Sequence, residues 1–381
     1  MKKVVYIINH ISFFISHILP IAKQAKKNYK IFVIFGEPAS LEMEKIAMKT
    51  FKKYKIGYKK ISYSSSNINI VIELLKLIKV FFVINRIKPD IIHAVGNKAI
   101  LFGGIVSRIL SIKGLVIFVT GMGFLYSNKL NFKEIFIKKI IFFIKKFIFK
   151  HKNKIIVVEN FDDCKFFLKK FCLKKDDITL IKGAGVNLKK FKKINNNNNK
   201  QISLFARVIE EKGIKEFISA SIILKKRYPN WKFVVAGALD YKKNSLLDKN
   251  IIEKLNKKKT TEFIGYQHDV MSVYKKTSIV CLPSYREGLP KCLLEASALG
   301  LPIVTTNVIG CRDAIINKKT GLLAKVKNVN SLVSKLSFLI KNKNIRSKYG
   351  KNGRNFAIKN FDLNIVIKKN LDIYSNLISK N

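Results

Sequence analysis

Residues 279–306 read IVCLPSYREGLPKCLLEASALGLPIVTT, and this stretch contains the alternation of elements on which the fold depends. Its opening β-branched run predicts a buried strand, and residues 291–299 predict a helix. Pro290 suits the first position of that helix, where its missing N–H group costs nothing, and Gly300 suits the position after the last turn. Residues 302–306 then predict a second strand. A strand, a helix and a strand in this order indicate a βαβ unit with parallel strands.

The same alternation runs through the rest of the chain and pauses once, at the five asparagines that end at Asn199. A run of this composition cannot build a core and predicts a solvated linker. We therefore predict the α/β class, with two Rossmann-like domains facing a central cleft. Residues 1–185 would form the first domain, 186–200 the linker and 201–355 the second domain. Other predicted strands are 4–8, 31–35, 91–95, 115–120, 155–158, 201–206, 232–237 and 261–265.

The chain is strongly basic, with 74 lysines and arginines against 24 aspartates and glutamates and a formal net charge of +50. This charge fits a nucleic acid, an anionic membrane surface or an anionic small substrate as partner. A coding bias toward AT-rich codons is an alternative for most of the lysines, because isoleucine, asparagine and phenylalanine are also abundant. We find no RNP-like aromatic motif, helix-turn-helix pattern or zinc finger, so we expect no specific nucleic-acid partner.

The number and spacing of the cysteines, together with the lengths of the apolar runs, indicate the cellular compartment of the protein. The five cysteines are odd in number and include no C-x-x-C pair, which argues against a disulfide framework and against a zinc site. The first 20 residues imitate a signal peptide, but Asn9, His10, Ser16 and His17 interrupt the apolar run. No uncharged apolar run reaches about 18 residues, so we expect no spanning helix. A cytoplasmic protein fits these observations.

Two acids, Glu287 and Glu295, lie on either side of the predicted helix start in a chain that has few acids. Five helical residues span roughly 7 Å, so the two carboxylates are placed to bind hydroxyl groups on different rings of one ligand. Backbone N–H groups at the same helix start favour anions. In the alternative interpretation, Glu287 only stabilises the helix dipole and Glu295 is a solvated helix residue.

The sequence resembles the GT-B glycosyltransferases of retaining family 4, in particular a bacterial subgroup that builds polysaccharides, O-antigens and lipid-linked glycans. Glu287 and Glu295 enclose seven residues, as in the E-x7-E signature of that family. The matching stretches follow the family order over nearly the whole chain, and their combination is specific. The other matching stretches are FISHILPIAKQ (14–24), TGMGFLYS (120–127), GAGVNLKKF (183–191), FARVIEEKGI (205–214) and NKKTGLLAKVKN (317–328).

The resemblance implies a nucleotide-sugar donor site in the second domain. Arg207 and Lys212 would pair with the diphosphate, Glu295 would bind the ribose hydroxyls and Glu287 would face the transferred sugar. Fixed cations would stabilise the negative charge of a leaving diphosphate. Without the resemblance, the residues alone favour the alternative that Arg207 and Lys212 are a solvated basic pair at a strand end. The resemblance also implies that 356–381 form a helix packed on the first domain. The implied donor-site residues are Arg207, Lys212, Glu287, Gly288, Leu289, Pro290 and Glu295.

Two departures from the family pattern affect the expected chemistry. His93 in IIHAVGNK fits the first histidine of an H-x-H strand end, but Val95 occupies the second position. His93 is therefore a candidate catalytic residue on the acceptor side, with a packed core histidine as the alternative. The chain has no D-x-D motif, so we expect transfer without a metal, and no cofactor besides the donor substrate.

Residues 132–150, FKEIFIKKIIFFIKKFIFK, predict a basic amphipathic helix. The pairs Lys138–Lys139 and Lys145–Lys146 are seven residues apart and therefore share one side of it. Such a helix can lie on an anionic bilayer, although an ordinary helix packed on the core is the alternative. We expect peripheral association with the inner face of the cell membrane and a lipid-linked glycan acceptor, such as a polyprenyl-diphosphate sugar.

The expected reaction is transfer from a UDP-sugar with retention of the anomeric configuration. The motifs of the first domain show no carboxylate in a recognisable base position, so a direct inverting attack has no evident general base. A sugar-nucleotide epimerase or a phosphorylase would share the fold. Epimerases lack the EGLP stretch, and a phosphorylase would need a cofactor lysine in a much longer chain. A basic nucleic-acid-binding protein is the alternative from a different class.

Overall fold

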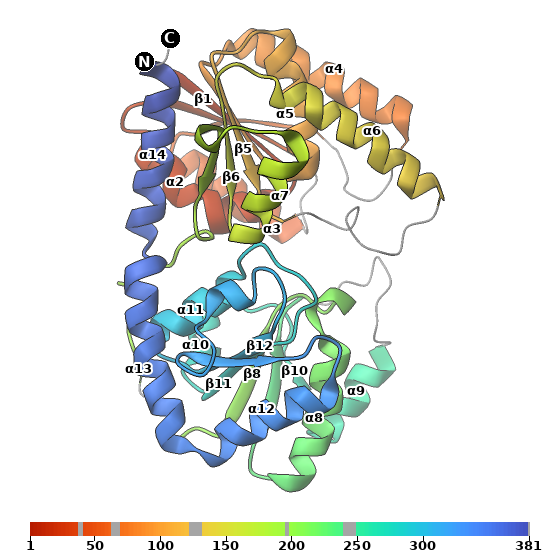
Figure 1. Cartoon of the computed structure of the whole chain (residues 1–381), viewed down its shortest axis with the longest axis vertical. Coiled ribbons are helices and arrows are strands. Elements are labelled where there is room, and N and C mark those ends of the chain that lie inside the picture. The colour runs from red at the N-terminus through yellow and green to blue at the C-terminus, as the bar shows by residue number, and fades with distance from the viewer. Residues whose placement is uncertain (37–40, 62–68, 122–131, 195–197, 239–248, 380–381) are drawn as a thin grey trace. The chain divides into compact units, whose positions relative to one another are not determined.

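The computed structural model describes residues 1–36, 41–61, 69–121, 132–194, 198–238 and 249–379. Contacts divide the chain into two compact units. Unit 1 comprises Met1–Ala184 together with Asn364–Asn381, and unit 2 comprises Gly185–Leu363. Each unit has its own parallel sheet with helices on both faces (Figure 1). The predicted α/β class with two Rossmann-like sheets is therefore confirmed.

Unit 1 contains a seven-stranded sheet in the order β3-β2-β1-β4-β5-β6-β7, with every neighbouring pair parallel. Its strands are β1 (Lys3–Ile8), β2 (Lys30–Phe35), β3 (Gly57–Lys60), β4 (Ile91–Val95), β5 (Gly114–Val119), β6 (Lys154–Val158) and β7 (Ile178–Leu180). Its helices are α1 (Ile11–Phe13), α2 (Leu19–Ala25), α3 (Leu41–Lys53), α4 (Ile70–Ile87), α5 (Asn97–Ile109), α6 (Phe132–Phe149), α7 (Phe161–Phe171) and α14 (Leu363–Ser379). A π-helical turn, Phe14–Ile18, joins α1 to α2.

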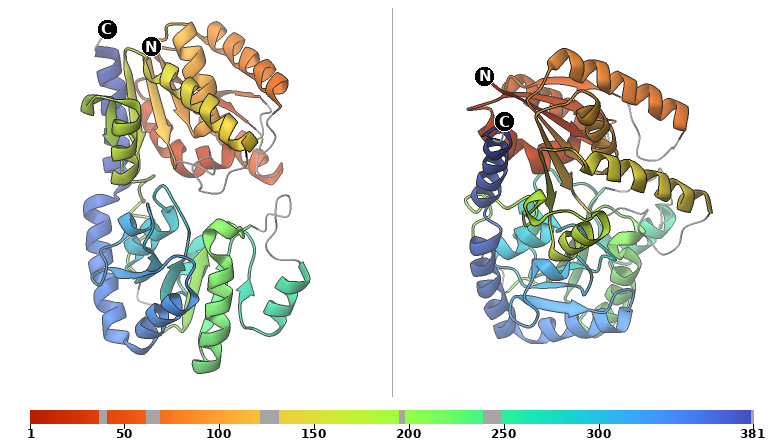
Figure 2. Two further views of the ribbon diagram at one scale, coloured as in Figure 1. Left: turned by 45° about the vertical axis from the view of Figure 1, so that its right-hand side comes forward. Right: turned by 45° about the horizontal axis from the view of Figure 1, so that its top comes forward.

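The sheet of unit 1 is buried on both faces because its strands are almost entirely apolar. Along β1, Val4, Tyr6 and Ile8 face one core layer, whereas Val5 and Ile7 face the other. The first layer is covered by α1, α2, α3 and α14, and the second by α4, α5, α6 and α7. Figure 2 shows α4, α5 and α6 together on their side of the sheet.

Unit 2 contains a six-stranded parallel sheet in the order β10-β9-β8-β11-β12-β13. Its strands are β8 (Gln201–Phe205), β9 (Lys232–Ala236), β10 (Glu262–Phe263), β11 (Ile279–Leu282), β12 (Ile303–Thr306) and β13 (Gly321–Ala324). Its helices are α8 (Ile214–Arg227), α9 (Lys249–Lys257), α10 (Val270–Tyr274), α11 (Lys291–Leu299), α12 (Val329–Lys341) and α13 (Lys343–Asn360). Short 3-10 turns occur at Lys175–Asp177 in unit 1 and at Glu210–Lys212 and Arg312–Ala314 in unit 2.

Two predicted boundaries differ from the structure. The predicted linker 186–200 is not wholly separate, because Val186 and Phe191 are buried in the core of unit 2. Burying these two apolar side chains in the core is more favourable than exposing them to water in a solvated linker. The predicted terminal helix 356–381 is divided between α13 and α14, and only the residues from Asn364 onward belong to unit 1. None of the helices in the described parts of the chain combines the length and apolar character that a membrane span requires.

Candidate functional site

The strand order of unit 2 reverses between β8 and β11, and the candidate site lies where these two strands end. The chain proceeds outward from β8 through β9 to β10, then returns to the other side of β8 with β11. Loops after two such strands diverge to opposite faces of the sheet, which leaves a crevice at their carboxyl ends. Arg207 and Lys212 follow β8, and Glu287 follows β11. The topology therefore brings segments about 75 residues apart in sequence to one edge.

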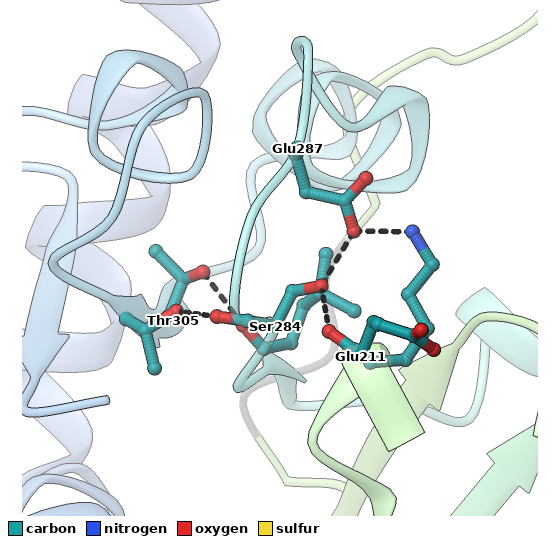
Figure 3. Close-up of polar contacts among 7 residues, drawn as sticks. Glu211, Ser284, Glu287 and Thr305 are labelled. Carbon is teal, nitrogen blue, oxygen red and sulfur yellow. Dashed lines mark hydrogen bonds and ion pairs between the residues drawn. The ribbon is translucent and has the colours of Figure 1, made fainter. Parts of the chain in front are cut away.

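Lys212 and Glu287 form an ion pair at this edge. The Nζ atom of Lys212 lies 2.5 Å from Oε1 of Glu287. The two side chains are 21% and 13% exposed, so water screens their charges only in part. Ser284 lies 2.7 Å from the same carboxylate oxygen through its hydroxyl group (Figure 3). Two donors on one oxygen orient the carboxylate.

The backbone carbonyl of Glu211 ties the loop after β8 to the loop after β11. It accepts a hydrogen bond of 2.8 Å from the backbone N–H of Tyr285. The hydroxyl of Ser284 lies 2.8 Å from the same carbonyl oxygen (Figure 3). Because a hydroxyl has a single proton, Ser284 alternates between this carbonyl and Glu287 or divides its proton between them. These bonds hold Lys212 and Glu287 on connected segments of backbone.

Two glycines with positive φ allow the loops around the pair to approach closely. Gly213 has φ +69°, and a Cβ atom there would collide with the carbonyl oxygen of Pro283. Gly310 has φ +79°, and a Cβ atom there would collide with the carbonyl oxygens of Glu287 and Gly288. Both positions require glycine for conformation and for space. The loop that carries Glu287 is therefore enclosed by tight backbone contacts.

Arg207 lies at the same edge but differs in its surroundings. It is exposed, two residues beyond the end of β8. The next residue, Val208, is buried and donates its backbone N–H to Ala238 at 3.0 Å. Arg207 thus follows an anchored backbone and is itself an exposed residue at this edge. An exposed guanidinium can bind an anionic ligand without first leaving the core.

Glu295 lies one turn into α11 and is not a solvated helix residue. Its side chain is 12% exposed, and its Oε2 atom lies 3.2 Å from the hydroxyl of Tyr274. Lys291 lies 3.8 Å from Oε1, one turn earlier on the same helix. Burial raises the pKa of Glu295, and Lys291 and Tyr274 partly oppose that shift. A carboxylate that is desolvated but held by a tyrosine suits a ligand hydroxyl as its next partner.

The helix start differs by one residue from the prediction. Helix α11 begins at Lys291, and Pro290 is the N-cap residue, with φ −70° and ψ 117°. Leu289 is buried and belongs to the core of unit 2. Gly288 and Leu289 therefore contribute backbone groups to the loop between β11 and α11. The buried side chain of Leu289 also anchors this loop. The predicted contacts of Gly288, Leu289 and Pro290 with a donor stay predictions.

The structure places His93 in the core of unit 1, on the middle residue of β4. It is fully buried, and its Nδ1 atom lies 2.6 Å from the hydroxyl of Tyr374 on α14. Its ring lies 5.0 Å from Tyr6 and 5.9 Å from Phe118, measured between ring centroids. Burial lowers the pKa of His93 to about 3, so the imidazole is neutral. This environment is that of the packed core histidine, the alternative to a catalytic role.

Sequence reasoning missed three residues that support the site. Ser284 orients Glu287, and Tyr274 holds Glu295. The hydroxyl of Tyr285 lies 2.8 and 3.0 Å from the two carboxylate oxygens of Glu216 on α8 and donates its single proton to that carboxylate. Ser284 and Tyr285 lie two and three residues beyond the end of β11, so their position near a strand end was the signal available in the sequence. Tyr274 lies 21 residues from Glu295, and no local pattern connects the two.

The comparisons with known proteins cover both units. The model described as "Glycosyl transferase 4-like" matches residues 3–159. The model described as "Glycosyl transferases group 1" matches residues 186–356, which include Arg207, Lys212, Glu287 and Glu295. The two family models together extend over most of the chain.

Two curated relatives match over most of their length. The N,N'-diacetylbacillosaminyl-diphospho-undecaprenol alpha-1,3-N-acetylgalactosaminyltransferase of Campylobacter jejuni is 29% identical over 345 residues, which is 86% of this chain and 89% of the relative. The UDP-Gal:alpha-D-GlcNAc-diphosphoundecaprenol alpha-1,3-galactosyltransferase of Escherichia coli is 25% identical over 328 residues, 82% of each chain.

Solved structures share the fold at low sequence identity. The Anabaena protein Alr3699/HepE in complex with UDP and glucose has a TM-score of 0.78 at 15% identity, covering 98% of this chain and 100% of its own. A glycosyltransferase from Rickettsia africae has a TM-score of 0.74 at 19% identity and covers both chains completely. At this level of sequence identity, the structural similarity shows that these proteins share the fold of this chain.

Proposed function

Because this chain belongs to the GT-B glycosyltransferases of the family 4 type, we propose that it transfers a sugar from a nucleotide diphosphate donor to a lipid-linked glycan. The observation that carries this proposal is the Lys212–Glu287 pair at the switch point between β8 and β11. The family supplies the reaction class, and this pair supplies a cation and a carboxylate for a charged sugar donor.

The charges of the site suit the departure of a diphosphate. As the bond from the sugar to the diphosphate breaks, negative charge grows on the phosphate oxygens, and fixed cations stabilise it. We assign this role to Lys212 and Arg207, since both follow β8 at the edge where ligands bind. Arg207 can engage two phosphate oxygens through its planar guanidinium.

The two glutamates are assigned to the two ends of the donor. Glu287, oriented by Ser284, would accept hydroxyl groups of the transferred sugar. Glu295, held by Tyr274, would accept the ribose hydroxyls. Each carboxylate already has a fixed donor in the structure and retains capacity to accept further hydrogen bonds. Neither assignment requires a metal.

The acceptor proposed is a glycan on a polyprenyl diphosphate, and the donor proposed is a UDP-sugar. The names of both curated relatives contain diphospho-undecaprenol acceptors, and that of the Escherichia coli relative contains a UDP-sugar donor. We also propose retention of the anomeric configuration, with the leaving diphosphate taking the proton of the acceptor on the same face of the sugar.

We further propose peripheral association with the inner face of the cell membrane, where a lipid-linked acceptor resides. Helix α6 supports this through exposed Phe136 and Phe143 next to exposed Lys139 and Lys146. One part of the sequence prediction was wrong. Lys145 does not face outward with its neighbour but is buried, 3.1 Å from Oδ1 of Asn97, because α6 packs this side on α5.

The test is a transfer assay with defined substrates. Purified protein is incubated with a panel of UDP-sugars and GDP-sugars and with polyprenyl-diphosphate-linked mono- and disaccharides. Mass spectrometry then detects extension of the lipid-linked glycan by one sugar. We expect extension with at least one UDP-sugar and with no GDP-sugar. Hydrolysis or epimerisation of a donor, with no extension of any lipid-linked acceptor, would contradict the proposal.

A further inference from the structure

Helix α4 exposes a continuous row of large apolar side chains. Only Val80 and Ile84 are buried among its residues, although the helix is 18 residues long. Its outward-facing apolar residues are Ile70, Val71, Ile72, Leu74, Leu75, Ile78 and Phe82, each between 42% and 74% exposed. A helix that only covers a sheet presents polar residues on its outer face. The composition of the outer face of α4 therefore suits contact with an apolar environment other than the core of unit 1.

The exposed apolar residues of α4 recur at the spacing of an α-helix. Val71, Leu75, Ile78 and Phe82 are separated by four, three and four residues, so they form one stripe along the helix. Asn69 caps the helix start by accepting backbone N–H groups at 3.1 and 3.3 Å. The exposed stripe is therefore displayed by an ordered, capped helix.

Helix α6 repeats the same pattern. Phe136, Ile140, Phe143 and Phe147 are again separated by four, three and four residues, and all four are exposed. Lys139 and Lys146 are also exposed and lie along one flank of this stripe. The opposite side of α6 is fixed to the unit, because Ile148 is buried against α5 at Gly104, where a Cβ atom would meet it.

The two helices lie on the same face of the unit 1 sheet. Both pack against α5, and their buried residues belong to one core layer. Figures 1 and 2 show α4 and α6 adjoining α5 on this side of the sheet. Two stripes with matched spacing thus belong to one surface of one unit, which we call the α4/α6 surface.

Among the described side chains of this surface, the fully exposed charges are of one sign. Exposed positions on the described parts of the two helices hold Lys79, Arg86, Lys139 and Lys146, and no aspartate or glutamate. The acid of α4, Glu73, is only partly exposed and forms ion pairs with Lys98 at 2.9 Å and Lys76 at 3.3 Å. Apolar stripes beside cations complement an anionic lipid surface, in which acyl chains lie beneath negative headgroups.

We propose that the α4/α6 surface docks on an anionic lipid bilayer, with the α4 stripe entering the interface and the α6 lysines facing the headgroups. This inference deepens the membrane association proposed above, because it names α4 as the main apolar contact. It rests on the exposure, spacing and charge of the two helices, and its test uses no sugar substrate. Failure of docking is thus distinguishable from failure of the proposed transfer reaction.

The test is flotation with two kinds of vesicle, phosphatidylcholine alone and phosphatidylcholine mixed with phosphatidylglycerol. We expect the protein to float with the mixed vesicles. The variant Val71→Gln/Leu75→Gln/Phe82→Gln should lose about a hundredfold or more in partition coefficient, because each exposed side chain adds apolar area to the interface. The matched control, Ile222→Gln/Phe338→Gln/Ile358→Gln, removes apolar residues of 39–44% exposure from helices of unit 2 and should bind as the parent does.

A second pair of variants tests the charge. Lys139→Gln and Lys146→Gln should each lower binding to mixed vesicles about fivefold and flatten its salt dependence. Exposed lysines of unit 2 give the control, Lys226→Gln and Lys351→Gln, which should have no effect. Circular dichroism and thermal unfolding of every variant confirm that the fold is kept, since all the changed side chains are exposed.

Three results would overturn the proposal. Equal flotation with both vesicle types would exclude recognition of an anionic surface. Parent protein that floats with neither type would exclude docking. Unchanged flotation of the α4 variant, together with loss of self-association in sedimentation, would identify the surface as a contact with a second copy of the chain instead.

Discussion

The side chains of Lys212 and Glu287 meet at 2.5 Å between the loops that follow two adjacent parallel strands, β8 and β11. Each neutralises the other while both remain partly buried. An incoming diphosphate competes with Glu287 for Lys212, and a sugar hydroxyl competes with Lys212 for Glu287. Donor binding therefore replaces one internal ion pair by two contacts with the ligand, and the pair keeps each group oriented until then.

Removing Lys212 should affect turnover far more than folding. We expect Lys212→Ala to lower kcat about 10²–10³-fold, because a fixed cation facing the leaving diphosphate is lost. Glu287→Ala should be equally damaging. Lys215→Ala is the matched control, since Lys215 lies one turn away, more than half exposed, in a 3.5 Å ion pair with Glu210. Steady-state kinetics check this, and a Lys212→Ala enzyme with parental kcat would remove Lys212 from the site.

Arg207 provides a separate test of the diphosphate site. Arg207→Ala should lower kcat about 10²–10³-fold with little change in thermal stability, because the side chain is exposed. Arg227→Ala, at the exposed end of α8, removes the same charge from the same unit and should leave kcat unchanged. Equal kinetics for the two variants would mean that Arg207 belongs to the basic surface and not to the donor site.

The sequence alone predicted the features that depend on local pattern. Short β-branched runs and the Pro290–Gly300 helix located β11, α11 and β12, because strand and helix periodicity are properties of adjacent residues. It also located Glu287 on the loop after a strand, and the family resemblance placed Lys212 at the same donor site. It did not predict that they pair directly, since their distance depends on the order of strands in the sheet.

Side-chain burial was the harder part to predict. The sequence grouped Lys145 with Lys146, yet one is buried and the other exposed, because adjacent helical residues point about 100° apart. The hydrogen bond between His93 and Tyr374 joins positions 281 residues apart. The exposure of the apolar row on α4 could not be predicted, because the sequence does not say which side of the helix the sheet covers.

Glu295 should act through donor affinity. Glu295→Gln keeps the size of the side chain but removes the charge that accepts ribose hydroxyls, so KM for the donor should rise about ten- to hundredfold with a smaller change in kcat. Tyr274→Phe removes the hydrogen bond that holds Glu295 and should raise KM less. Donor-dependent kinetics at saturating acceptor measure both effects. A fall in kcat with unchanged KM would assign Glu295 to the transition state instead.

His93 should make the stability of the protein depend on pH below neutrality. Its pKa is about 3 in the folded protein and about 6.5 in an unfolded chain, because burial disfavours the charged imidazole. Between these values the unfolded chain binds a proton that the folded protein does not. The free energy of unfolding should therefore fall by about 1.4 kcal/mol for each unit that the pH is lowered from 6.5 toward 3.

The His93→Gln variant isolates this contribution. Denaturant unfolding is compared between parent and variant from pH 7 to pH 4, and the difference between their free energies should shrink as the pH falls. A parent and His93→Gln variant with parallel pH profiles would show that His93 is protonated or accessible in the folded protein.

The stereochemistry of transfer tests the proposed mechanism as a whole. An inverting reaction needs a general base on the face of the sugar opposite the leaving group. The acids assigned to the donor, Glu287 and Glu295, are already engaged by Lys212 or Tyr274, so neither is poised as that base. The leaving diphosphate can instead take the acceptor proton on its own face while Lys212 and Arg207 balance its charge. We therefore expect an α-linked product from an α-linked donor, read from the anomeric coupling constant in proton NMR. A β-linked product from the same donor would contradict both the mechanism and the roles given to these four residues.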